Sequence, residues 1–528
     1  MRRLALVLPA LVVVLLAAGT LLASAQDKPR SGGELVFVVP SEPPSYDAHQ
    51  EETFGLIHPM APHYSTLLRV DPTDRTGTKP AGDVAESWTV SKDLLTYTFK
   101  IRKGVKFHDG TELTAEDVKY TYEVMKDPAT KARQSRDFAT FKETIVKDKY
   151  TVEVVMEKPF APFVAKILVT PIYPKHYHSS MKLEEFNTKP MGTGPFKFKE
   201  WFPTDRMVME RFDGYWGGPA YLDAVVMKMM SEASVRMLAL RTGEIQLDKW
   251  FPPPAELPKF KADRNFNAYQ FECPCTRIIN LNNKHPFFGD RKVRQALMFA
   301  IDRDALIKNL FPGQAVAALH QVSPVYPDWR NTNVKKYTYN PAEARKLLAE
   351  AGWKPGPGGI LVNAQDQPFK FTLLHIQGEE ETLNTAVAAQ KWLKDVGIQM
   401  EIENQETATV IDRVWNKKEF DAAIYVWTLG GRQGDPDVAP QWHSKGNDNQ
   451  PLYANPKVDE LIDKGLATMN YRERVNYYKE VSAILAEDVP MLWLMHPIFH
   501  FIASARLKGL KNGPNGQYDY LHKAWLER

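Results

Sequence analysis

The stretch from Lys79 to Pro128 constrains the fold of this chain more than any other. Apolar and polar side chains alternate from Tyr97 to Arg102, which is the pattern of a strand with one buried face. Asp109-Gly110 is a typical hairpin dipeptide. Thr114, followed three residues later by an aspartate, starts a pattern like a capping box that predicts a helix from Ala115 to Lys126. We therefore expect a strand, a tight turn and a capped helix in succession.

The same stretch contains a histidine next to an aspartate, His108 and Asp109, which could serve as catalytic groups. Both residues fall at the turn between the predicted strand and the predicted helix. We therefore expect residues 107–110 to define a turn and a lobe core rather than a catalytic site.

The length and charge of the chain limit its class. At 528 residues it is too long for one hydrophobic core, so two or three subdomains are expected. An apolar content of 44% and a charged content of 25% are those of a soluble globular protein. The net charge of +3 falls to about +1 without Arg2 and Arg3, which argues against nucleic acid as the main partner.

The N-terminus has the features of an export signal. Arg2 and Arg3 precede an apolar run from Leu4 to Leu22, and Ala23-Ser24-Ala25 is followed by polar residues. The alternative is an uncleaved anchor helix, because the run approaches the length that spans a bilayer. The small residues before Gln26 favour cleavage after Ala25, and no nearby cysteine could carry a lipid.

Cys273 and Cys275 are the two cysteines of the chain. Cysteines this close would form a strained disulfide ring. We expect two buried thiols on one strand, with a strained local disulfide as the second possibility. Neither state gives the chain a redox function.

The remaining sequence alternates between strand and helix patterns. Strands are predicted at Glu34–Pro40, Val152–Glu157, Phe196–Trp201, Ile278–Asn282, Phe369–Ile376 and Ile398–Ile402. Helices are predicted at Ala233–Thr242, from Pro286 on to Arg303, and at Tyr339–Trp353, Ala386–Val396, Lys457–Ala467 and Tyr471–Ala486. Pro159–Pro174 is expected to be more loop than helix, and the apolar segment Met491–Ala503 to pass from one lobe back to the other.

Several of these segments together resemble a known family. Lys79–Pro128 is similar to the W-x-V-S-x-D … V-x-F-H-D-G-x-x-L-T-A-x-D-V pattern of the solute-binding proteins that serve peptide, nickel and related ABC importers. Further elements match patterns of the same family at Gly192–Phe196, Phe212–Trp216, Gly243–Leu247, Pro286–Leu297 and Tyr339–Trp353. The chain departs from the family in having Phe212 in place of the usual asparagine, Gln246 in place of an acid and one extra residue before Asp290. The resemblance runs from about Gly33 to Leu510.

This resemblance implies an α/β fold, the two-lobed periplasmic binding protein of class II, in the large cluster with an extra subdomain. Mixed sheets flanked by helices form the lobes, and a hinge joins them. The implied division is a signal peptide at 1–25, a first lobe at 33–274 that is completed by about 500–528, and a second lobe at 275–499. A subdomain of about 60–185 is inserted in the first lobe.

The resemblance also implies a function without catalysis. The protein would be the periplasmic receptor of an ABC importer, a monomer that captures a small solute between closing lobes and delivers it to permease subunits in the inner membrane. The solute would be a peptide or a non-peptide organic molecule, anions included. No cofactor, metal or nucleic acid is expected.

Enzyme motifs are missing from the sequence. It has no H-E-x-x-H, G-x-S-x-G, P-loop or C-x-x-C pattern. The histidine pairs His58/His63 and His176/His178 have no metal-ligating neighbours at defined spacing. Asp435, Asp437 and His443 lie close in sequence without an aligned nucleophile. An exported hydrolase remains the enzyme alternative, and an exported protein that docks partners or unfolded chains is a second non-enzyme alternative.

Aromatic and polar residues in four segments are candidates for the solute site, because such pockets combine aromatic walls with a few polar groups. One segment resembles the ligand loop of the family, W-x-x-D followed by D-P. The candidates are Glu52 and Phe54, Trp250 and Phe251, Arg413, and Trp427, Thr428, Arg432 and Asp435 of the loop-like segment.

The loop-like segment bears on the choice of solute. Peptide-binding members of the family hold the α-ammonium of the peptide with a carboxylate just after the loop tryptophan, but after Trp427 this chain has no acid before Asp435. A buried ammonium without a partner costs several kcal/mol, roughly. Arg432 suits a carboxylate instead. We expect a non-peptide solute, acidic or aromatic, with a di- or oligopeptide as the alternative because a glycine-rich loop could still bring Asp435 into the pocket.

Overall fold

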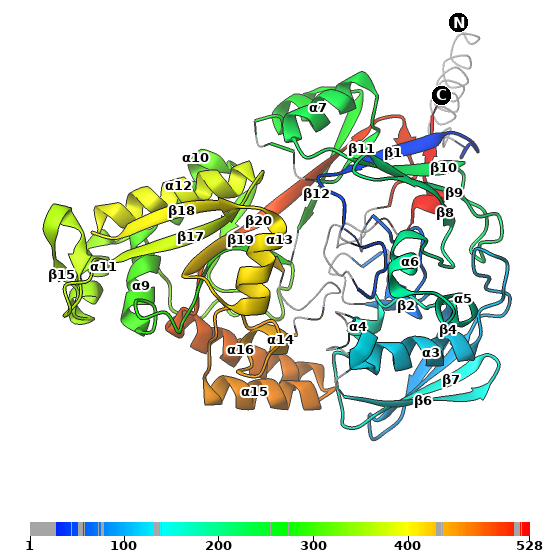
Figure 1. Cartoon of the computed structure of the whole chain (residues 1–528), viewed down its shortest axis with the longest axis horizontal. Helices are drawn as coiled ribbons and strands as arrows, with labels where there is room; N and C mark the ends of the chain where they lie inside the picture. Colours follow the sequence, from blue (N-terminus) through cyan, green and yellow to red (C-terminus); the bar gives the residue numbers. More distant parts are fainter. Residues whose placement is uncertain are drawn as a thin grey trace, which may run out of the picture.

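The computed structural model describes residues 28–527, apart from 44, 51–55, 57–58, 72, 75–78, 131, 133–134, 136–137, 139, 251, 254, 273, 429–434, 436, 512–517 and 519. The predicted signal peptide and the candidates Glu52, Phe54, Phe251 and Arg432 lie outside these residues. Figure 1 shows two lobes side by side, one formed by the first half of the chain and its C-terminus, the other by the second half. Within the described residues, no helix combines the length and the apolar character needed to cross a membrane.

One mixed sheet runs through both lobes. Its order is β18-β17-β19-β13-β20-β11-β1-β10-β9-β8, with β12 and β14 also paired to β20. The strands are β1 (Glu34–Val39), β8 (Phe196–Phe202), β9 (Arg206–Arg211), β10 (Ala224–Met229), β11 (Leu247–Asp248), β12 (Phe266–Glu272), β13 (Cys275–Leu281), β14 (Ala315–Ala317), β17 (Lys370–Ile376), β18 (Gln399–Gln405), β19 (Ala422–Thr428) and β20 (Met491–Ser504). The first part of β20 pairs with β13 and its later part pairs with β12 and β11, so this strand crosses between the lobes, as the sequence predicts.

The first lobe packs its core on one face of β1, β8, β9 and β10. The buried residues of this core include Phe37, Met207 and Phe501, and the C-terminal residues Tyr518 and Leu521 complete it. Two helices, α7 (Ala233–Thr242) and α8 (Leu257–Ala262), contribute to a smaller core on the opposite face, with Val38 and Ile502. The predicted end of α7 at Gly243 is confirmed, since this glycine adopts a left-handed φ of 79° there.

A separate antiparallel sheet, β4-β5-β7-β6, forms a subdomain of the first lobe. Its strands are β4 (Ala85–Val90), β5 (Thr96–Ile101), β6 (Phe141–Asp148) and β7 (Thr151–Met156), and α3 (Ala115–Lys126) and α4 (Phe163–Ile167) share a core with it. The strand, turn and helix expected from the sequence are confirmed, including the capping box of α3. His108 bonds the backbone of Gly192 and Gly194, which anchors the turn to the neighbouring loop.

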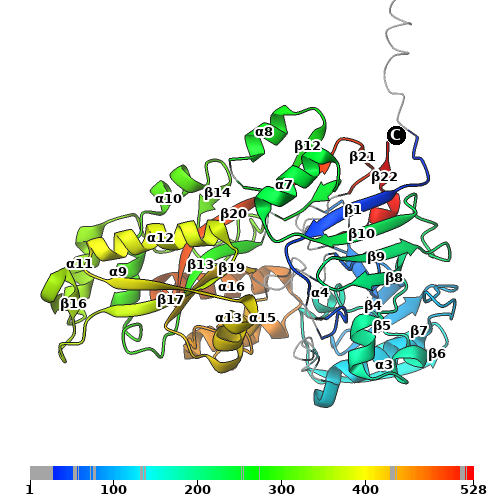
Figure 2. The same ribbon diagram turned by 45° about the horizontal axis from the view of Figure 1, so that its top comes forward.

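Helices cover both faces of the sheet in the second lobe (Figure 2). On one face lie α9 (Arg291–Ala300), α10 (Arg303–Leu310), α11 (Pro341–Glu350) and α12 (Glu380–Asp395); on the other lie α13 (Thr407–Ile411), α14 (Ala439–Trp442), α15 (Pro456–Ala467) and α16 (Tyr471–Asp488). Successive side chains of a strand point to opposite faces of the sheet. Ile279 of β13 therefore packs into the core on the α9–α12 face, and Ile278 packs into the core on the other face.

The structure corrects several local predictions. The helix expected to run on to Arg303 is two helices, because Asp302 caps a new helix by accepting a bond from the Ala305 amide. Helix α12 starts at Glu380, before the predicted start. Pro159–Pro174 is mostly loop, as predicted, with the short helix α4 inside it. Cys275 is disulfide-bonded, and since the sequence has one other cysteine, the prediction of two free thiols is wrong.

Candidate ligand-binding site

The subdomain of the first lobe contacts the second lobe beside the predicted ligand loop. Figure 1 shows α4 next to the helices α14 to α16. Lys166 of α4 places its Nζ 3.3 Å from Oδ2 of Asp437, and the side chains are 11% and 2% exposed. The Ala161 amide donates a 3.0 Å hydrogen bond to the carbonyl of Leu466, the next-to-last residue of α15. An ion pair and a backbone bond therefore join the two lobes directly.

Asp435 is bound within its own lobe. Both of its carboxylate oxygens accept hydrogen bonds from Arg474 of α16, at 2.7 and 2.6 Å. The guanidinium of Arg474 also lies over the rings of Trp329 and Tyr478, 5.5 and 5.4 Å from their centres. Burial works to lower the pKa of Arg474, but Asp435 outweighs it and the pKa is raised. The Asp435 carboxylate thus already has a bidentate cationic partner.

Trp427 and Thr428 end strand β19. Trp427 is 6% exposed and packs in the core of the second lobe, edge-on to Trp442 at 5.5 Å between ring centres. Thr428 pairs with Cys275 of β13 and is half-buried. The strand therefore brings Thr428 to the point where the chain enters the predicted loop.

Two other candidates, Arg413 and Trp250, have partners outside this loop. Arg413 forms an ion pair with Glu403 at 2.9 Å and donates to the carbonyl of Glu419. The Trp250 amide donates to Asp248, and the Trp250 carbonyl accepts a hydrogen bond from Arg236. The structure gives these residues defined partners within their own lobes.

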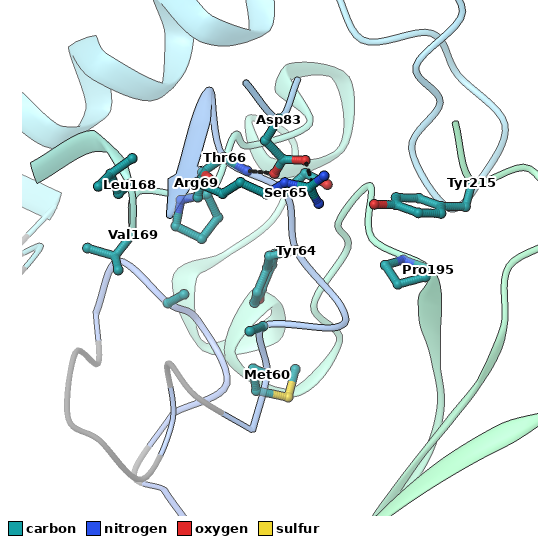
Figure 3. A pocket seen from close by; sticks show the side chains of 13 residues that line it. Met60, Tyr64, Ser65, Thr66, Arg69, Asp83, Leu168, Val169, Pro195 and Tyr215 are labelled. Carbon is teal, nitrogen blue, oxygen red and sulfur yellow. Dashed lines mark hydrogen bonds and ion pairs between the residues drawn. The ribbon is translucent and has the colours of Figure 1, made fainter. Parts of the chain in front are cut away.

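A cavity of about 50 Å³ lies in the first lobe, lined largely by residues of its connecting segments (Figure 3). Its wall includes Leu168 and Val169, which closely follow Lys166, and Met60, which follows the segment of Glu52 and Phe54. Its polar lining comes from Tyr64, Ser65, Thr66, Arg69, Asp83 and Tyr215. The volume exceeds what one water molecule requires. Two residues of the cavity wall are therefore near neighbours in sequence of Lys166, which contacts the other lobe.

The charged residues of this cavity lining are Arg69 and Asp83. Asp83 lies 3.9 Å from Arg69 and accepts a bond from the Thr66 amide, while its carbonyl accepts a 2.7 Å bond from Arg102. Burial raises the pKa of Asp83, against the lowering effect of Arg69 and Arg102. The Arg69 guanidinium lies 4.8 Å from the centre of the Tyr520 ring. The Arg69 guanidinium therefore lies between the Asp83 carboxylate and the Tyr520 ring at this wall.

The arrangement does not support the hydrolase alternative. His443 lies near Asp459 and Asp463, while Asp435 and Asp437 bind Arg474 and Lys166. The three residues that lie close in sequence thus have separate partners. No group of three or more metal-ligating side chains exists among the residues with described positions.

Sequence reasoning missed Lys166, Arg474 and Arg69. Lys166 is the one charge in the apolar run Phe160–Val169, and a lone lysine in such a run is a signal of a buried partner. Arg474 and Arg69 carry no comparable signal, because their partners come from other elements.

Comparisons with known proteins agree with this architecture. The family model of the bacterial extracellular solute-binding proteins, family 5, matches residues 79–449. The oligopeptide-binding protein AppA of Bacillus subtilis is 31% identical over 95% of this chain and 93% of the relative, and the dipeptide-binding protein of Escherichia coli is 28% identical over 83% and 84%. The solved structure of AppA in complex with a nonapeptide has a TM-score of 0.88 at 30% identity and covers 95% of this chain and 100% of that one. The chain belongs to the family 5 extracellular solute-binding proteins, the two-lobed receptors of ABC importers.

Proposed function

We propose that this receptor captures a small organic solute between its lobes in the periplasm and delivers it to permease subunits in the inner membrane. The proposed division is the one expected from the sequence: a signal peptide at 1–25, a first lobe at 33–274 with its subdomain at about 60–185, and a second lobe at 275–499, with about 500–528 returning to the first. The protein acts as a monomer without cofactor or catalysis. Sequencing the N-terminus of exported protein tests the signal, because it should begin at Gln26.

The solute would lie against the end of β19 and the loop that follows, with Thr428 and Trp427 on the second lobe. The other candidates remain proposed contacts because of their aromatic or polar side chains: Trp250, Arg413, Glu52, Phe54, Phe251 and Arg432. The arrangement of the lobes supports this place, since their direct contact involves Asp437 at the end of that loop.

The choice of solute depends on one observation: Arg474 donates hydrogen bonds to both carboxylate oxygens of Asp435. A peptide ammonium could bind Asp435 only by displacing a bidentate, nearly buried guanidinium. That exchange would leave Arg474 buried without its partner, which costs several kcal/mol, roughly. We infer that the solute is not held by an ammonium–Asp435 pair.

The Arg69 guanidinium at the first-lobe cavity supports an acidic solute. Arg69 and Asp83 line this cavity together with Tyr64 and Tyr215, and Arg102 donates to the backbone carbonyl of Asp83. A carboxylate of the solute would gain a charge-assisted bond from Arg69. The proposed solute is therefore a small organic acid with an apolar or aromatic part.

Peptides are the second candidate, favoured by the relatives named for oligopeptide and dipeptide binding. Titration calorimetry with di- and tripeptides and with their N-acetylated forms separates the candidates. Micromolar binding that is lost on acetylation and on Asp435→Asn would contradict the acidic-solute proposal. Binding of aromatic carboxylic acids that weakens at least tenfold in Arg69→Gln, but not in the exposed-site control Arg345→Gln, would support it.

A further inference from the structure

Lys166 and Asp437 belong to different bodies of the molecule. Lys166 lies on α4 between Phe163 and Ile167, both of which are buried in the core of the subdomain. Asp437 precedes Val438, which is buried in the core of the second lobe. A movement of one lobe away from the other must therefore separate the two side chains.

Each oxygen of the Asp437 carboxylate has a partner from a different lobe. Oδ1 accepts a 3.0 Å bond from the Ala439 amide in the second lobe, and Oδ2 lies 3.3 Å from Nζ of Lys166 in the first. The nearby charges are Asp435, which opposes the ionised form of Asp437, and Arg474, which favours it. Because Arg474 is already bonded to Asp435, Lys166 is the main cation that balances Asp437.

We propose that Lys166 is a positioning residue for solute capture: it latches the subdomain onto the end of the ligand loop and so stabilises the closed arrangement of the lobes. The latch rests on the proposed function for its purpose. The latch itself does not involve the solute, because the ion pair and the Ala161–Leu466 hydrogen bond both connect one lobe directly to the other.

The energetics favour this role over a purely structural one. In separated lobes both charges return to water and lose little, since an exposed pair has little net value. In closed lobes the pair is nearly dry, and removing Lys166 leaves a buried carboxylate without its cation. A change at Lys166 therefore penalises the closed state and hardly touches the open one, which shifts the balance between them.

The test measures closure without solute. The full chain is dialysed free of co-purified solute, and amide hydrogen exchange is followed at single-residue resolution for Ala161, whose amide bonds only across the lobes. Lys166→Met should speed exchange of this amide about tenfold and enlarge the radius of gyration in solution scattering. The amide of Ile424, in the core of the second lobe, should keep its exchange rate and so report an intact fold.

Two comparisons make the outcome decisive. Lys457→Met removes an exposed lysine paired with Glu460 and should leave Ala161 unchanged. Asp437→Asn keeps an acceptor for Ala439, and combined with Lys166→Met it should open the lobes less than the two single changes together predict. Unchanged exchange at Ala161 in Lys166→Met, or a wild-type Ala161 amide as fast as in an unfolded chain, overturns the latch. Since no solute is added, failure of the calorimetry above leaves this result standing on its own.

Discussion

The two lobes differ in how closely one acid in each is paired with arginine. In the second lobe, Asp435 is neutralised inside the lobe by two short bonds from Arg474. In the first lobe, Arg69 lies 3.9 Å from the Asp83 carboxylate, and Arg102 donates to the backbone carbonyl of the same residue. The Asp435 carboxylate therefore has a tight bidentate partner in its own lobe, whereas the Asp83 carboxylate has a looser one.

Asp437 differs from both of these acids, whose arginine partners lie in their own lobes. It follows Asp435 by two residues, but its cation, Lys166, comes from the other lobe. The pairing of Asp435 therefore stabilises the second lobe itself, whereas the pairing of Asp437 requires the two lobes to be closed. Substitutions at Arg474 and at Lys166 therefore separate effects on folding from effects on lobe movement.

The largest effect is expected from Arg474→Met. This change leaves Asp435 in a nearly buried place without its partner, and we expect the second lobe to lose about 3–5 kcal/mol of stability. Urea unfolding, followed by hydrogen exchange in the core strand β19, measures the loss in that lobe.

The double variant Arg474→Met with Asp435→Asn provides the control. It should recover part of the loss, because the neutral amide is cheaper to bury than the lone carboxylate. If the double variant is as unstable as the sum of the single ones, the ion pair does not account for the effect and the stacking of Arg474 on Trp329 and Tyr478 does.

The acid sensitivity of the lobes should be the next largest effect. Burial lowers the pKa of His49 in the first lobe and of His496, on the crossing strand β20, to about 3. The unfolded chain binds protons at these residues below about pH 6.5, while the folded protein resists them until about pH 3. Stability is therefore present above pH 6.5 and is lost as the pH falls, by about 2 kcal/mol per histidine at pH 5.

Two substitutions assign this acid sensitivity. His49→Gln retains a donor to the Pro171 carbonyl in place of Nε2, and His496→Asn retains one to the Cys275 carbonyl in place of Nδ1. Each should flatten the fall in melting temperature between pH 7 and pH 5. Burial also raises the pKa of Asp47 to about 6, which stabilises the fold as the pH falls and so partly masks the His49 effect in wild-type protein. A fall as steep in both variants as in wild type would assign the acid sensitivity to other groups.

Local signals in the sequence predicted the local structure well. The helix Ala115–Lys126 is confirmed at both ends, because a capping box and a following proline act on neighbouring residues. The break between α9 and α10 was not predicted. Asp302 fits a continuous helix in the sequence pattern, and its role as the cap of α10 depends on the direction of its side chain.

The site was less accessible to prediction for a physical reason. Asp435 was recognised as a loop acid, but its availability depends on Arg474, 39 residues away on another helix. Asp437 depends on Lys166, which belongs to another lobe. Burial and pairing of charges arise from packing between distant elements, and a single sequence carries no periodic signal of it.

The smallest effects should come from helix caps, one in each lobe. The side chain of Asn470 accepts bonds from the amides of Arg472 and Glu473 at the start of α16, the helix that carries Arg474. Asn470→Ala should therefore cost about 1 kcal/mol. Thr114→Ala at the start of α3 should cost less, about 0.5 kcal/mol, because Asp117 still binds the amide of residue 114. Thermal melts of the two variants rank the costs, and hydrogen exchange of α16 and α3 locates them. If Asn470→Ala also loosened Arg474 from Asp435, its cost would approach that of Arg474→Met, and the charge balance of the second lobe would depend on the start of its helix as well as on the ion pair.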